Sequence, residues 1–389
     1  MLLTALALLF ASVVQATPLA KRDFGPLTIF QPPSTYTAPR VMYGRHVLLN
    51  DAQGTLLSTW ENYDWTRQPY LPIYRSTDHG FTWSKISEIQ DTQLGIGLPY
   101  QPHLFQLPQA LGNYPAGTVL AAANAANLTK TAAYADRTLW STQLELYASR
   151  DKGVTWEFVS HITAKAGGTG PDGKDPTPVW EPYLFFYNNQ LVCYYSDERD
   201  PAHNQKLVYT TTSDLKTWSA IQPAAANADS NARPGMAVVS KVPNGYMMTY
   251  ELCNPPSGQP NCAVTFRIAD SPFNFQNAKE VQLKSTDGYA PTSSPYNVWT
   301  PIGASSGATA NGAIVVTALS TSDFFISRDL GATWTRAPTV QTASYSRSLS
   351  VGFNPKDIVA IGGGPFQGDG TRNAITIVAQ DVNGCKTCS

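Results

Sequence analysis

The chain has 389 residues, a formal net charge of −1 and only 14% charged residues. So low and balanced a charge provides no electrostatic footprint for nucleic acid or an anionic membrane, which excludes both as expected partners. The length would allow two or three domains, and the 11% aromatic share suits both an all-β core and a surface that stacks on sugar rings.

The chain begins with an apolar run, Leu2 to Val14, that ends in the small-residue pattern Val14-Gln15-Ala16. At about a dozen residues the run is too short to span a bilayer, so it predicts a secretory signal peptide and an extracellular protein. The dibasic pair Lys21-Arg22 is typical of a processing site. The predicted division is a signal peptide over 1–16, a short propeptide over 17–22 and a single mature domain over 23–389.

The pattern S-x-D-x-G-x-T-W recurs at roughly 60-residue intervals, which is typical of β-propeller blades and similar arrays. Asp can bond backbone N–H groups two residues on and Gly can take a positive φ, so together they close a tight turn. The Thr and Trp then begin the next strand, where the Trp can pack between neighbouring blades. This arrangement is the Asp-box, and it predicts architecture rather than chemistry. Full copies lie at Ser76–Trp83, Ser149–Trp156 and Ser327–Trp334, with partial copies at Ser213–Trp218 and Ala269–Phe275.

Six clusters of strand-forming residues, separated by Gly, Pro and Asn turns, predict an all-β fold: a six-bladed β-propeller in one domain. The last cluster is a strand short, and Pro26–Phe30 is left over at the start. We expect this segment to pair near Ala374–Ala379, which would close the ring and cover both edges. The six clusters open at Ala38–Met42, Tyr100–Phe105, Val179–Tyr183, Arg233–Val239, Tyr296–Trp299 and Tyr345–Leu349.

Five cysteines fit an oxidising compartment. Cys253 and Cys262 bracket a turn-rich loop that a disulfide would pin. Cys385 and Cys388 form a C-x-x-C without a βα context or a second pair of ligands, so we expect a small terminal disulfide there. Cys193 is the odd cysteine and is predicted to be a buried thiol. Asn127-Leu128-Thr129 is the one N-glycosylation sequon, which makes Asn127 a candidate glycosylation site.

Two glutamates stand out as candidate catalytic groups, because innermost strands of a propeller converge on a central pocket. Glu181 precedes Pro182, which we expect to hold it extended. Glu251 lies in an apolar strand, Met247–Cys253, where an unpaired carboxyl is costly. Either Glu could instead bond backbone N–H groups at a strand end. Together they suggest a glycosidase, which needs one carboxyl to protonate the leaving oxygen and another as nucleophile or base.

At these residues the sequence resembles the fungal exo-α-1,5-L-arabinanases of glycoside hydrolase family 93, and the likeness extends over essentially the whole mature chain. The Asp-boxes, the Trp180–Tyr183 and Thr249–Leu252 segments and Tyr345-Ser346-Arg347 carry it. The resemblance implies a six-bladed propeller of the sialidase clan, retention of anomeric configuration and release of arabinobiose from linear arabinan. It implies that Glu181 is the acid/base, Glu251 the nucleophile and Tyr345 a pocket residue. The spacing itself leaves open which Glu has which role.

Further residues near the segment openings are candidate substrate-binding groups. Three arginines could form a cationic floor or, equally, bond loop carbonyls; four ring-bearing residues could contact furanose rings or simply pack. Only five His are present and none pair at ligand spacing, so no metal and no cofactor are expected. The candidates are Arg40, Arg233 and Arg347, and Tyr43, His103, Tyr183 and Trp299.

Two other classes of function remain open on the sequence alone. A sialidase would use Tyr345 as nucleophile and the arginines to hold a carboxylate, but Ala38–Met42 departs from the Arg-Ile-Pro pattern that sialidases carry. A sugar-binding lectin, or an inert scaffold, would need no catalytic pair. Lectin propellers repeat their binding residues, whereas the six openings here differ, which favours one catalytic pocket in a monomer. The opening residues compared are Arg40, Gln101, Glu181, Arg233, Tyr296 and Tyr345.

Overall fold

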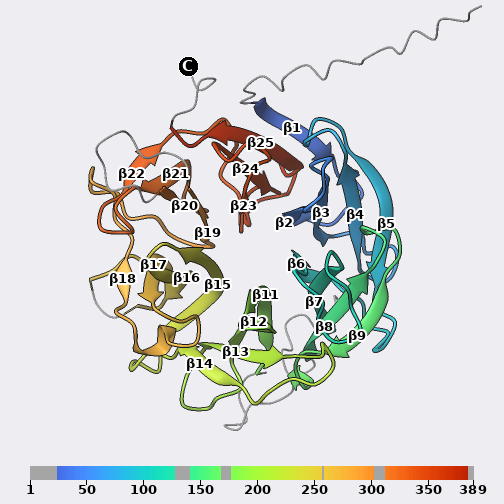
Figure 1. Ribbon diagram of the computed structural model, residues 1–389, viewed down its shortest axis with the longest axis horizontal. Helices are drawn as coiled ribbons and strands as arrows, with labels where there is room; N and C mark the ends of the chain where they lie inside the picture. Colours follow the sequence, from blue (N-terminus) through green and yellow to red (C-terminus); the bar gives the residue numbers. More distant parts are fainter. Residues whose placement is uncertain (1–23, 128–140, 168–176, 256–257, 302–311, 384–389) are drawn as a thin grey trace, which may run out of the picture.

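Six antiparallel sheets stand around a central axis like blades, and the strands nearest the axis are β2, β6, β11, β15, β19 and β23 (Figure 1). This computed structural model describes residues 24–127, 141–167, 177–255, 258–301 and 312–383. The predicted signal peptide and propeptide, Cys385 and Cys388 lie outside these residues, as does the sequon beyond Asn127. Within them the one helix is a short 3₁₀ turn, η3 (Phe275–Asn277), so no helix is long and apolar enough to cross a membrane.

The predicted all-β, six-bladed propeller is confirmed, and all six predicted openings lead into the innermost strands. The second blade carries one additional short strand, β10, beside β8. Blade one is β2 (Val41–Leu48), β3 (Leu56–Asn62), β4 (Tyr70–Ser76) and β5 (Ser84–Gln90); blade two is β6 (Tyr100–Gln106), β7 (Val119–Asn127), β8 (Ser141–Ser149), β9 (Glu157–His161) and β10 (Ala166–Gly167); blade three is β11 (Val179–Tyr187), β12 (Gln190–Asp197), β13 (Lys206–Thr212) and β14 (Gln222–Ala225). Blade four is β15 (Arg233–Val242), β16 (Gly245–Cys253), β17 (Ala263–Ala269) and β18 (Val281–Gln282); blade five is β19 (Tyr296–Thr300), β20 (Ala313–Ala318), β21 (Thr321–Ser327) and β22 (Thr335–Ala337); blade six is β23 (Ser348–Val351), β24 (Asp357–Gly362), β25 (Ile375–Asp381) and β1 (Phe24–Phe30).

The ring is closed by the N-terminal strand, as predicted. β1 pairs with β25, so that Leu27 lies opposite Ile377 and Phe30 opposite Ile375. The indole of Trp60 is fully buried at this seam and stacks on Phe30, with ring centroids 5.3 Å apart. The N-terminal strand thus covers the edge of β25 and becomes the outermost strand of the last blade, while β23 is innermost.

The hydrophobic core lies between neighbouring blades, because each sheet packs its face on the next. Between blades two and three, for example, Leu146 and Leu184 belong to one buried cluster with Cys193, which is a free, buried thiol as predicted. Six such seams hold the innermost strands around the axis, where their ends can build a pocket.

The S-x-D-x-G-x-T-W turns form the predicted staples. The Asp151 carboxylate accepts the backbone N–H of Thr155 at 2.9 Å and its hydroxyl at 2.6 Å, while Gly153 takes a φ of 89°. Trp156 packs against the core cluster shared by blades one and two, and its indole N–H donates to Ser87 of the preceding blade at 3.2 Å. The turn therefore fixes both a hairpin and the seam to its neighbour.

Asp151→Ala is expected to lower the free energy of unfolding by about 1–2 kcal/mol, since several orphan donors lose their acceptor. Burial alone would raise the pKa of Asp151, but the hydrogen bonds from Thr155, Ser149 and Val154 together outweigh burial and lower it. The contribution is therefore present above the unfolded pKa of Asp and is lost as the pH falls through the folded pKa. Denaturant unfolding at neutral pH measures the loss, with Asp329→Ala in the matching blade-five turn as a replicate. A loss below about 0.3 kcal/mol in both variants would contradict this role.

Candidate active site

Each blade presents at least one left-handed residue near the start of its innermost strand, and Arg40 and Ser293 are second ones in blades one and five. Non-glycine residues reach this conformation at a cost, and such residues cluster at functional sites. In blades one to four this residue interrupts the pairing of the first two strands as a bulge, which re-aims the side chain toward the axis. The six residues and their φ values are Tyr43 (53°), Gln101 (55°), Glu181 (63°), Met236 (61°), Ser294 (45°) and Ser346 (53°).

The expectation that Pro182 holds Glu181 extended is wrong. Glu181 has a φ of 63°, because a following proline excludes the right-handed helical region but leaves the left-handed one open to this bulge. Its backbone N–H donates to the side-chain oxygen of Gln101 at 3.0 Å. Its Oε2 accepts the Ser196 hydroxyl at 2.7 Å and the Met236 N–H at 2.8 Å. Glu181 is thus held by blades two, three and four.

Glu251 lies on the second strand of blade four, opposite Gly235, the residue just before the bulge. Its Oε2 accepts the N–H of Ser294, the left-handed residue of blade five, at 2.8 Å, and the hydroxyl of Ser293 at 3.0 Å. The strand-end bonding expected of a structural Glu is therefore present, and it also fixes the direction of the carboxylate.

Glu181 and Glu251 line the same cavity of about 260 Å³ at the axis. A second cavity of about 370 Å³ adjoins it, and the two share Gln101 and Trp180. Tyr345 lines the second cavity, where its ring packs against that of Phe366, with centroids 5.2 Å apart. The structure thus places the two predicted carboxyls in one cavity and the predicted tyrosine in the adjoining one.

The pKa values of the two carboxyls are both raised by burial, but different neighbouring groups act on each. Burial and then the charge of Glu251 raise the pKa of Glu181 to about 7, against the bonds from Ser196 and Met236 that lower it. Burial also raises the pKa of Glu251, while the bonds from Ser294 and Ser293 and the charge of Arg233 oppose that shift. Since the Glu251 charge acts on Glu181, Glu251 ionises first and Glu181 keeps its proton.

Tyr345 retains its hydroxyl proton at neutral pH. Burial, followed by the negative charges of Glu251 and Glu181, raises its pKa well above the ordinary tyrosine value. A phenol in this position can donate a hydrogen bond to a neighbouring oxygen, and it is poorly suited to ionise as a nucleophile.

Three of the other predicted residues, Tyr43, His103 and Tyr183, line neither cavity. Tyr43 is buried under the guanidinium of Arg45, 3.9 Å from the ring centroid, and its ring faces that of Tyr345 at 6.1 Å. His103 and Tyr183 pack with ring centroids 4.4 Å apart. Burial, and then Arg45, lower the pKa of His103 well below its usual range, so the imidazole is neutral.

The three predicted arginines do not form a common floor. Arg233 lines the smaller cavity and donates to Glu198 at 2.7 Å. Arg40 lies near Asp369, whose pKa is lowered by hydrogen bonds from Thr371 and, to a smaller extent, by the charge of Arg40. Arg347 is fully buried and donates to carbonyls of blade five, including that of Ser322 at 2.8 Å.

Trp299 likewise packs against the core cluster of blades four and five instead of lining either cavity.

Glu61 was missed from the sequence, although it lines the larger of these two cavities. It lies opposite Met42, just before the blade-one bulge, and so matches Glu251 in position. Its Oε1 accepts the Gln101 N–H at 3.0 Å, as Glu251 accepts that of Ser294. Comparing the second strands of successive blades would have found it.

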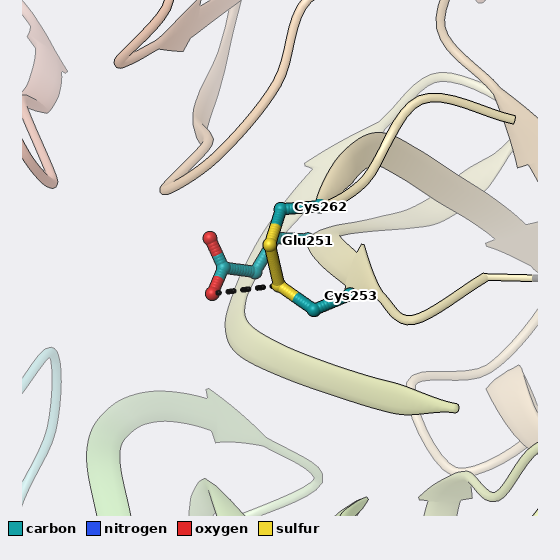
Figure 2. A group of neighbouring side chains, drawn as sticks. All are labelled: Glu251, Cys253 and Cys262. Atoms are coloured by element: carbon teal, nitrogen blue, oxygen red, sulfur yellow. Dashed lines mark hydrogen bonds between the residues drawn. A yellow bond between two sulfur atoms is a disulfide. The ribbon is translucent and has the colours of Figure 1, made fainter. Parts of the chain in front are cut away.

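The predicted disulfide between Cys253 and Cys262 is present and lies directly beside Glu251 (Figure 2). The Sγ atom of Cys253 is 3.6 Å from Oε1 of the carboxylate. The half-cystine sulfur has no proton to donate, so this is a van der Waals contact.

A β-propeller that places two carboxyls with raised pKa values in one cavity has the arrangement of a glycoside hydrolase. Comparison with solved structures identifies the family. An α-L-arabinofuranosidase from Fusarium graminearum, in complex with an iminosugar inhibitor, is 40% identical, covers 94% of this chain and 99% of its own, and has a TM-score of 0.84. This chain belongs to glycoside hydrolase family 93, as the sequence resemblance implied.

Two further structures agree. The family 93 α-L-arabinofuranosidase of Fusarium graminearum with arabinobiose is 41% identical over 92% of this chain and 98% of its own, with a TM-score of 0.83. The α-L-arabinanase of Penicillium chrysogenum with arabinobiose is 38% identical over 93% and 99%, also with a TM-score of 0.83. A scan against models of protein families found no match, and neither did a search of curated proteins.

Proposed function

We propose that this protein is a retaining exo-α-1,5-L-arabinanase that releases arabinobiose from the non-reducing ends of linear arabinan. The observation that carries the proposal is the pair formed by Glu181 and Glu251, which share one cavity and differ in proton affinity. Two relatives at about 40% identity hold arabinobiose. Secretion, proposed from the apolar run over 1–16, would bring the enzyme to an extracellular polysaccharide, and we expect it to act as a monomer.

The proposed reaction has two displacements. Glu251, ionised, attacks the anomeric carbon while Glu181 gives its proton to the departing glycosidic oxygen, which forms a covalent glycosyl-enzyme. Glu181, now ionised, takes a proton from water, and the resulting attack on the anomeric carbon releases the sugar and restores the Glu251 carboxylate. Tyr345 contributes a neutral hydroxyl beside both carboxyls.

The competing functions have less support. A sialidase needs cations to hold the substrate carboxylate, whereas Arg40, Arg233 and Arg347 have separate partners in separate places. A lectin would repeat its binding residues, but the six left-handed positions around the axis carry five different residue types.

The product profile on linear α-1,5-arabinan, with sialyl-lactose as the competing substrate, tests the proposal. We expect arabinobiose as the product, with NMR showing the α anomer as the first form released. Release of sialic acid would overturn the proposed substrate, and initial release of the β anomer would overturn the double displacement.

The pH dependence of kcat/KM should be bell-shaped. Activity should fall above about pH 7, because the acid Glu181, whose pKa is raised to about 7, loses its proton. It should also fall on the acid side, at a pH above the ordinary Glu range, because the raised pKa of Glu251 makes its carboxylate protonate earlier. Kinetics on arabino-oligosaccharides from pH 3 to 9 measure both limbs. An alkaline limb unchanged in Glu181→Gln would contradict the assignment.

A further inference from the structure

The disulfide between Cys253 and Cys262 touches the proposed nucleophile on one side and supports it on the other. Cys253 ends β16 two residues after Glu251, and Cys262 immediately precedes β17, so the bond ties the two strands together at the mouth of the site. On the near side, Sγ of Cys253 lies 3.6 Å from Oε1 of Glu251 (Figure 2).

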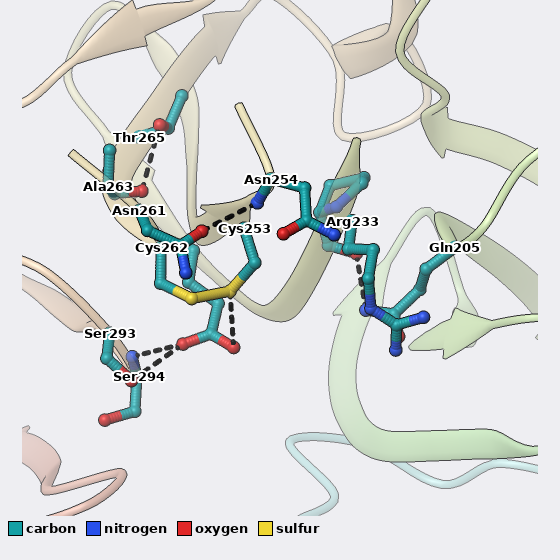
Figure 3. Close-up of a disulfide and its surroundings, with 12 residues drawn as sticks. Gln205, Arg233, Cys253, Asn254, Asn261, Cys262, Ala263, Thr265, Ser293 and Ser294 are labelled. Carbon is teal, nitrogen blue, oxygen red and sulfur yellow. Dashed lines mark hydrogen bonds between the residues drawn. A yellow bond between two sulfur atoms is a disulfide. The ribbon is translucent and has the colours of Figure 1, made fainter. Parts of the chain in front are cut away.

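On the far side, the backbone of the same disulfide holds the groups that bind the other carboxylate oxygen. The carbonyl of Cys262 accepts the N–H of Ser293 at 2.8 Å. Ser293 and Ser294 then donate their hydroxyl and N–H, respectively, to Oε2 of Glu251. Figure 3 labels the two serines and the two cysteines. A single covalent link therefore lies in contact with one oxygen and orients the donors to the other.

We propose that the Cys253–Cys262 disulfide is a positioning device for Glu251 in the proposed reaction, on which this inference rests. Oε2 accepts two hydrogen bonds, whereas Oε1 lies against the proton-free sulfur of Cys253, which cannot donate one. A carboxylate oxygen without a donor keeps its electron density, so Oε1 is the oxygen that attacks. The disulfide fixes its direction without hydrogen bonding to it.

Reduction should undo both effects. A phosphine takes the oxygen of water and delivers two electrons and two protons to the disulfide, giving a phosphine oxide and two thiols. The new S–H of Cys253 can then donate to Oε1, and the loop that carries Cys262 is no longer tethered to β16. Misplacing a reacting group by about 1 Å can cost roughly 100-fold in rate.

The test measures arabinobiose release by the oxidised enzyme, by the phosphine-reduced enzyme and by two double variants, Cys253→Ala/Cys262→Ala and Cys253→Ser/Cys262→Ser. We expect reduction to lower kcat roughly 10- to 100-fold with KM within about twofold, at a temperature where circular dichroism shows the fold intact. Both double variants lose the tether equally, but only serine can donate to Oε1. The serine variant should therefore have the lower kcat at equal thermal stability, a difference that a purely structural disulfide would not produce.

Zinc provides an independent readout. Ligand atoms of Glu251, Cys253 and Cys262 lie within 4.8 Å of one another, and two thiolates with a carboxylate suit Zn²⁺ once the disulfide is reduced. With phosphine removed, Zn²⁺ should inhibit the reduced enzyme and leave the oxidised enzyme and the alanine variant unaffected. Cys385→Ser/Cys388→Ser is the control, and it should respond to reduction like the wild type.

The outcomes separate this inference from the proposed function. Full kcat after verified reduction, or equal kcat in the serine and alanine variants, overturns the positioning role while the arabinanase proposal stands. Arabinobiose release by Glu251→Ala in the same assay overturns the role of Glu251 as nucleophile, and the inference with it.

Discussion

Replacing either Glu181 or Glu251 with alanine is expected to lower kcat on linear arabinan by about 10³-fold or more. Glu181→Ala removes the proton that the leaving oxygen needs, and Glu251→Ala removes the atom that forms the covalent intermediate. Arabinobiose release measured by chromatography gives both rates. Glu157→Ala is the matched control, because this Glu has a half-exposed side chain on β9 and should retain wild-type activity.

A substrate with a good leaving group distinguishes the two roles. An aryl arabinobioside whose phenolate departs without protonation should restore glycosyl-enzyme formation in Glu181→Ala, with a burst of phenol before slow hydrolysis. Glu251→Ala should remain inactive on the same compound, since no leaving group replaces a missing nucleophile. The reverse pattern would exchange the two roles, and activity of both variants on arabinan would remove the chemistry from this pair.

The architecture was predictable because its determinants are local in the sequence. The Asp and Gly of each S-x-D-x-G-x-T-W turn set a hairpin within eight residues, as the bonds from Asp151 to Thr155 illustrate. The sequence leaves an unassigned strand at Pro26–Phe30 and a last blade that is one strand short. Pairing the two completes the blade, and β1 does pair with β25. The spacing of the repeat predicts the blades, and the tendency of proteins to cover exposed strand edges predicts the pairing of the two ends of the chain.

The arrangement of the site was only partly predictable, since it depends on contacts between blades. Glu251 was predicted because a carboxyl is anomalous in an apolar strand. Glu61 can be recognised only by aligning Thr59-Trp60-Glu61 with Thr249-Tyr250-Glu251 on the second strand of another blade. The left-handed conformation of Glu181 also has no sequence signal beyond the proline after it. Arg347 resembled a pocket residue by position along the chain, but it follows the left-handed Ser346 and its side chain is bound by backbone carbonyls of blade five.

Glu61→Ala is expected to lower kcat/KM on arabinan by roughly 100-fold, and Glu61→Gln by roughly 10-fold. Glu61 holds the backbone of Gln101, whose side chain in turn accepts the Glu181 N–H at 3.0 Å. Alanine leaves the Gln101 N–H and the Tyr63 hydroxyl unpaired, each at a cost of about 1–3 kcal/mol, and so loosens the support of the acid. Glutamine keeps an oxygen for Gln101 but offers no second acceptor in the larger cavity.

Glu145→Gln provides the matched control for this prediction. Glu145 is also a buried carboxyl that accepts the hydroxyl of a tyrosine two residues on, and burial raises the pKa of both Glu145 and Glu61 to about 7. Glu145 lines neither cavity of the site. The two glutamine variants should therefore lose similar thermal stability, while only Glu61→Gln loses kcat/KM. The two residues share burial and a hydrogen bond from a tyrosine, and they differ in that only Glu61 lines a cavity of the site. Equal activity of the two variants would therefore make Glu61 a purely structural carboxyl.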